Sequence, residues 1–120
     1  MSRILAAELD EAEDPLAFVT ATLTGVLGSD YVEVDAGNEA VAAAAWLASA
    51  LPGGLPLDPN YGPATRPNDV SRSLADTALS ALGRVTGESS EWRELWDESD
   101  EAANALAAVE SVAEVLRTVT

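Results

Sequence analysis

Histidine, cysteine and lysine are all absent from this chain of 120 residues. Their absence excludes the usual general base at neutral pH, the thiol nucleophile, the amine that forms Schiff bases, and every strong nitrogen or sulfur metal ligand. Only carboxylate, hydroxyl and guanidinium groups remain for chemistry. We therefore predict a protein that is not an enzyme and has no catalytic residue, cofactor or metal site.

Positive charge is also scarce, since the chain has six arginines and 21 Asp and Glu residues, which give a net charge of −15. Such a charge repels phosphate backbones and anionic lipids, which argues against nucleic-acid and membrane-surface binding and favours a basic protein as partner. Hydrophobic residues still make up 48% of the chain, enough to bury a core. One folded, acidic domain over residues 1–120 is the prediction.

Long apolar runs are missing as well. The longest, residues 40–48, is far shorter than the ~20 residues that cross a bilayer. Residues 1–8 contain an arginine and a carboxylate in place of the apolar stretch of a secretion signal. A cytoplasmic location is the resulting expectation.

Apolar residues recur at helical spacing in most of the chain, which predicts an all-α bundle of five to six helices. A short first helix over residues 4–9 has Ser2 as its cap. The second follows Asp14, a suitable N-cap, and Pro15, and it ends at Gly28. Residues 31–35 alternate like a strand, but no second strand is available to pair with them, so we expect an extended connection.

The third predicted helix starts at a cap on Asp35 or Asn38 and reaches Leu51. It is apolar on all sides and rich in alanine, which predicts a central helix that neighbours approach closely. We expect its middle to hold some of the most buried residues of the protein: Val41, Ala44, Ala45, Trp46 and Leu47.

Five of the six prolines fall in residues 52–67, which excludes a helix and predicts one long irregular loop. We expect Leu55, Leu57 and Tyr61 to pack beneath this loop; a functional loop is the alternative. A fourth helix follows from Asn68 to a stop at Gly87, and a fifth is capped by Ser89 or Ser90. The last begins at Ser99 or Asp100, and its predicted buried stripe is Ala103, Leu106, Val109, Val112, Ala113 and Leu116.

Clustered carboxylates are the only groups with metal-binding potential. Glu94, Glu98 and Glu101 would share one stripe if the last two helices were continuous, and three such carboxylates can hold Mg²⁺ or Ca²⁺. Exposed helix faces normally carry charge, so a solvated acidic face is the preferred interpretation. The same holds for the acidic residues between positions 10 and 14.

Two tryptophans one helical turn apart, Trp92 and Trp96, stand beside these acids. Core anchoring is the usual role of such a pair, because the chain has few other aromatic residues. Interfaces are nevertheless rich in tryptophan. If either ring is exposed, the candidate partner surface consists of Trp92, Trp96, Glu94 and Glu98.

Two segments resemble a bacterial domain-of-unknown-function family numbered 4259: YVEVDAGNEAVAAAAWLA at 31–48 and ALGRVTGESSEWRELWDES at 81–99. In that family an extended YLE leads into an alanine-rich helix, and a later helix leads into SELxELWEE. The resemblance covers residues 5–115, although this chain lacks the family's opening Trp-Gly-x-Gly-x-Phe-x-Asn-Asp segment. It implies a small helical bacterial protein, and it supplies no activity and no catalytic residue to transfer.

Three hypotheses for function follow. The preferred one is a non-enzymatic acidic module that binds another protein, in the manner of an immunity or inhibitor protein. The second is a carboxylate-based, metal-assisted hydrolase that uses either acidic cluster. The third is a structural helical unit that associates with itself as a homo-oligomer.

Overall fold

The fold is all-α, as predicted, and we describe it from a computed structural model over residues 10–54, 67 and 70–119. Five helices follow one another within this part of the chain: α2 (Pro15–Leu27), α3 (Val34–Ala48), α4 (Arg72–Val85), α5 (Glu91–Asp97) and α6 (Ala102–Arg117). The predicted first helix, the cap at Asn68 and the packing of Leu55, Leu57 and Tyr61 lie outside the described residues.

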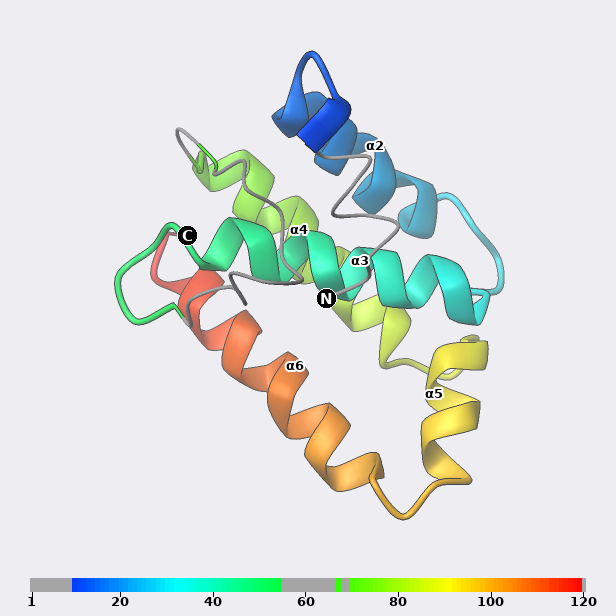
Figure 1. The fold of residues 1–120 in the computed structure, drawn as a ribbon. Coiled ribbons are helices and arrows are strands. Elements are labelled where there is room, and N and C mark those ends of the chain that lie inside the picture. The colour runs from blue at the N-terminus through cyan, green and yellow to red at the C-terminus, as the bar shows by residue number, and fades with distance from the viewer. Residues whose placement is uncertain (1–9, 55–66, 68–69, 120) are drawn as a thin grey trace.

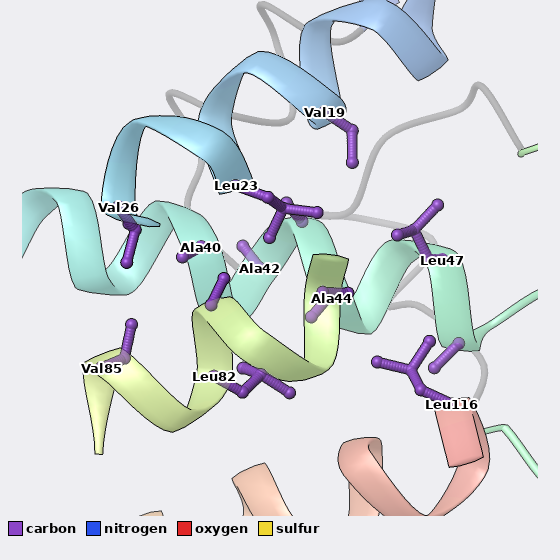
Figure 2. Packing of buried hydrophobic residues seen from close by; sticks show 14 of the residues in the cluster. Val19, Leu23, Val26, Ala40, Ala42, Ala44, Leu47, Leu82, Val85 and Leu116 are labelled. Carbon is purple, nitrogen blue, oxygen red and sulfur yellow. The ribbon is translucent and has the colours of Figure 1, made fainter. Parts of the chain in front are cut away.

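Helix α3 occupies the centre of the bundle and packs against each of α2, α4, α5 and α6 (Figure 1). Its alanines make this arrangement possible, because small side chains let neighbouring backbones approach closely. Five of them are buried: Ala40, Ala42, Ala43, Ala44 and Ala48. Figure 2 shows side chains of α2 and α4 placed around this alanine-rich stretch, among them Leu23 and Leu82.

The predicted core is largely confirmed, with differences at its edges. Ala44, Trp46 and Leu47 are fully buried, whereas Val41 and Ala45, one turn apart on a single face of α3, are only partly buried. In α6 the stripe is confirmed at three positions, Val109, Ala113 and Leu116. The prediction was wrong for Ala103, which is exposed because it lies in the first turn of α6, before the stripe reaches the core.

The N-caps predicted from the sequence agree with the structure at some helices and differ at others. The Oδ1 atom of Asp14 accepts a hydrogen bond from the Ala17 N–H at 3.1 Å, so Asp14 caps α2 as predicted. Helix α4 was predicted to start at Asn68, but it begins at Arg72 and is capped by Ser71, whose hydroxyl accepts from the Leu74 N–H at 3.1 Å. The start predicted for the last helix was too early, because Ser99 instead accepts from the Glu101 N–H and α6 begins at Ala102.

Helix α3 differs from the prediction at both ends. It begins at Val34, before either predicted cap, and it ends at Ala48 in place of Leu51. After it the chain turns through Gly53, whose φ of 85° suits glycine because it carries no Cβ. Helix α3 starts early because a side chain of α5 caps its first turn.

Candidate interaction surface on helix α5

Helix α5 is joined to the chain that precedes α3 by backbone hydrogen bonds. The Val32 N–H donates to the Ser89 carbonyl at 2.9 Å, and the Glu91 N–H donates to the Val32 carbonyl at 2.7 Å. These bonds form one parallel bridge between Val32 and Ser90. The predicted extended connection is therefore paired at this point, although it forms no sheet within the described residues.

The start of α3 is capped by a side chain from α5. The Oε1 atom of Glu91 accepts a hydrogen bond from the Val34 N–H at 2.8 Å, which satisfies one of the donors that a helix leaves open at its first turn. The predicted caps, Asp35 and Asn38, lie inside the helix. Asn38 instead accepts from the Trp92 indole N–H through its Oδ1 atom at 3.0 Å.

Ser90 is the residue that begins α5, as one of the two predicted caps. Its hydroxyl accepts a hydrogen bond from the Arg93 N–H at 3.2 Å, and its side chain is fully buried. A buried hydroxyl is tolerated because it is hydrogen-bonded. The cap therefore also anchors α5 in the bundle.

Trp92 was predicted as part of the candidate surface, and the structure places it elsewhere. It is 3% exposed and lies directly against Gly37 of α3, where a Cβ would come within 2.8 Å of the Trp92 Cβ. Trp96 is partly buried against it, with the two ring centroids 6.0 Å apart. The core-anchoring interpretation therefore holds for Trp92, while Trp96 keeps a partly open edge.

Two residues of α5, Glu94 and Leu95, are exposed together with Glu98, the C-cap of the helix, and Tyr31 lies beside them. The Tyr31 hydroxyl donates a hydrogen bond to the Oε2 atom of Glu94 at 2.5 Å. Tyr31 is 44% exposed and Leu95 is 46% exposed. We call these four residues, Tyr31, Glu94, Leu95 and Glu98, the α5 patch.

The carboxylate of Glu94 also controls the ionisation of Tyr31. The hydrogen bond to Glu94 is the main cause that raises the pKa of Tyr31 from 10.0 to about 12, with smaller effects of desolvation and of the charges on Glu94 and Glu91. The fold thus favours the neutral phenol. The contribution of the Tyr31–Glu94 hydrogen bond to stability is present below pH 10.0 and is lost as the pH rises toward about 12.

Replacing Glu94 with glutamine is expected to lower the pKa of Tyr31 back toward 10.0, because a neutral amide accepts a weaker hydrogen bond from the phenol than a carboxylate does and does not repel the phenolate. Tyrosinate absorbance measures this in a Tyr61→Phe background, where Tyr31 is the sole tyrosine of the chain. Glu114→Gln, an exposed position on α6, is the matched control and should leave the titration unchanged. Identical titrations of the Glu94 and Glu94→Gln proteins would contradict the contact.

A family comparison identifies the domain. The model of DUF4259, a domain of unknown function, matches residues 1–109. The chain belongs to the DUF4259 family. Searches of curated proteins and of solved structures found no match.

The two segments that carry the DUF4259 resemblance meet in space. One contains Tyr31 and Val32 at its start and Gly37 and Asn38 in α3; the other contains Ser90 to Glu98 around α5 (Figure 1). The bridge at Val32, the Trp92 contacts and the Tyr31–Glu94 hydrogen bond all connect them. The α5 patch is therefore a feature of this junction.

The described carboxylates of this DUF4259 chain do not converge on one point. Helix α5 ends at Asp97 and α6 begins at Ala102, so Glu94, Glu98 and Glu101 do not share the stripe of one helix. Across the described residues, no group of three Asp or Glu side chains is placed to hold a metal ion. Of the other acidic cluster, Asp14 serves as the cap of α2.

Tyr31 and Leu95 are the members of the α5 patch that sequence reasoning missed. Leu95 stands three residues after Trp92, a spacing that places it in the same apolar stripe by periodicity alone. Tyr31 lies 63 residues before Glu94, and no local pattern indicates their contact.

None of the helices described here is long and apolar enough to span a membrane.

Proposed function

We propose that this DUF4259 chain is a non-enzymatic acidic module that binds a basic protein in the cytoplasm. The observation that carries the proposal is the excess of acidic charge, which the six arginines cannot neutralise. Between described residues there are two salt bridges, Arg93–Asp97 at 2.9 Å and Arg117–Glu110 at 2.7 Å. Because carboxylates outnumber arginines 21 to 6, the net charge of −15 remains whatever pairing occurs inside the fold.

Two of the arginines also donate hydrogen bonds to backbone carbonyls. An Arg84 amino group donates to the Ser29 carbonyl, and Arg93 donates to the Thr86 carbonyl at 2.8 Å while it pairs with Asp97. Uncompensated charge of one sign attracts a partner of the opposite sign and accelerates the encounter. The absence of histidine, cysteine and lysine supports a role that depends on binding and not on catalysis.

Affinity capture from a lysate of the source organism, run at low and at high NaCl, tests this function. We expect a protein with an excess of Lys and Arg to be retained at low salt and released at high salt, since screening weakens attraction between exposed charges. Mass spectrometry identifies the retained protein. A specific partner that is acidic, or one whose retention does not change with salt, would contradict the proposal.

A further inference from the structure

The α5 patch combines exposed apolar surface with negative charge. Among the described residues, three large apolar side chains are exposed, namely Leu27, Tyr31 and Leu95. Two of the three flank Glu94, one through a hydrogen bond and the other as its neighbour in the chain. Glu98, the C-cap of α5, is also exposed.

Among the described residues, no arginine forms a salt bridge with the carboxylates of this patch. Arg93 is engaged by Asp97 and by the Thr86 carbonyl, and neither salt bridge between described residues includes Glu94 or Glu98. The Tyr31 hydroxyl occupies Oε2 of Glu94. The Oε1 atom of Glu94 has no hydrogen-bond donor among the described residues, so it is available to one from a partner.

We propose that the α5 patch binds an arginine of the basic partner together with an adjacent apolar side chain. The inference rests on the proposed function and assigns its contact site. Glu94 and Glu98 are one helical turn apart, a separation of roughly 5–6 Å between Cβ atoms that a planar guanidinium spans with its several N–H groups. The Tyr31 ring offers a surface for the guanidinium face, and Leu95 offers apolar contact to its neighbour.

Arginine fits this surface better than lysine. Its guanidinium is planar, donates in a fixed fork to carboxylates and is weakly hydrated, whereas the lysine ammonium is a compact and strongly hydrated charge. Contact with an exposed aromatic face contributes about 0.5–1 kcal/mol, which corresponds to a factor of roughly two to five in affinity. Because an ammonium also contacts aromatic faces, the patch is expected to favour arginine over lysine by no more than about that factor.

The first test uses the wild-type chain and capped peptides as probes. Nuclear magnetic resonance follows titration with the peptide Leu-Arg-Arg-Leu, with its Leu-Lys-Lys-Leu counterpart, and with a neutral version that carries citrulline in place of arginine. We expect shifts concentrated on the Tyr31 ring, the Leu95 methyl groups and the Glu94 and Glu98 carboxyl carbons. The lysine peptide should bind more weakly, by up to about a factor of five, and the citrulline peptide should leave these signals unmoved.

Matched variants then separate the patch from the overall charge. Leu95→Asn should lower the affinity for the arginine peptide. Leu27→Asn, at an exposed leucine outside the patch, should leave that affinity unchanged. The double variant Glu94→Gln with Glu98→Gln should lower the affinity for the arginine peptide more than the control, Asp76→Asn with Glu114→Gln, does. The control removes the same charge from exposed positions of α4 and α6. Thermal melts verify that each variant folds.

The outcomes distinguish the contact site from the function. If both double variants weaken binding equally and the shifts spread over the whole surface, the patch assignment is overturned while an acidic binding module remains supported. Equal affinity for arginine and lysine would overturn the guanidinium preference. If no cationic peptide binds even at low salt, both the patch and the proposed function are contradicted.

Discussion

Replacing Trp46 with alanine is expected to lower the free energy of unfolding by about 3–5 kcal/mol. Trp46 is fully buried and is the largest such side chain in the described core. It projects from α3, the helix that packs against all four other described helices. Truncation therefore removes buried apolar area and leaves a cavity whose rigid, helical walls cannot close over it.

Urea denaturation followed by circular dichroism measures this loss. Leu95→Ala is a suitable control, because Leu95 is 46% exposed and substitutions at such positions usually change stability by no more than about 0.5 kcal/mol. A Trp46→Ala protein as stable as the wild type would show that α3 is not the centre of the fold.

Replacing Gly37 with alanine is expected to destabilise the protein by roughly 1–3 kcal/mol through overpacking. The added Cβ would come within 2.8 Å of the Trp92 Cβ and 3.0 Å of the Trp92 Cγ. Atoms at the base of a side chain cannot move aside without moving the backbone, so α5 would have to shift away from α3. The bridge at Val32 and the Glu91 cap would be strained in turn.

Two other helical glycines supply the control for this substitution. Apart from the neighbouring backbone of their own helices, Gly25 in α2 and Gly83 in α4 have no described atom within 4 Å of an added Cβ. Alanine at these positions should stabilise the protein by up to about 1 kcal/mol, since alanine favours helix over glycine. The opposite sign at Gly37 is the result that chemical denaturation should give. Stabilisation at all three positions would mean that α5 does not lie closely against α3.

Local chemistry explains how much of the fold could be predicted. Asp14 caps α2, Ser90 caps α5, and apolar spacing indicates the buried sides of α4 and α6, because these features depend on residues within one or two turns. The start of α3 could not be predicted this way. Its donor at Val34 is satisfied by Glu91, 57 residues later in the chain.

The candidate site was predicted in part for the same reason. Glu94 and Glu98 are exposed, as helix periodicity favours for charged residues. Trp92 is buried because glycine at position 37 allows it to reach α3, a contact between helices that neither segment reveals alone. Tyr31 joins the patch only once the chain folds and its hydroxyl meets Glu94.

The association rate constant with the captured basic partner, measured across a range of NaCl concentrations, tests the central claim most directly. Complementary charge acts mainly on the encounter, so the rate constant should fall steeply as salt rises, while the dissociation rate changes little. Glu94→Gln with Glu98→Gln should flatten that dependence more than Asp76→Asn with Glu114→Gln. An association rate constant that does not change with NaCl would contradict the account, because uncompensated acidic charge would then have no part in binding.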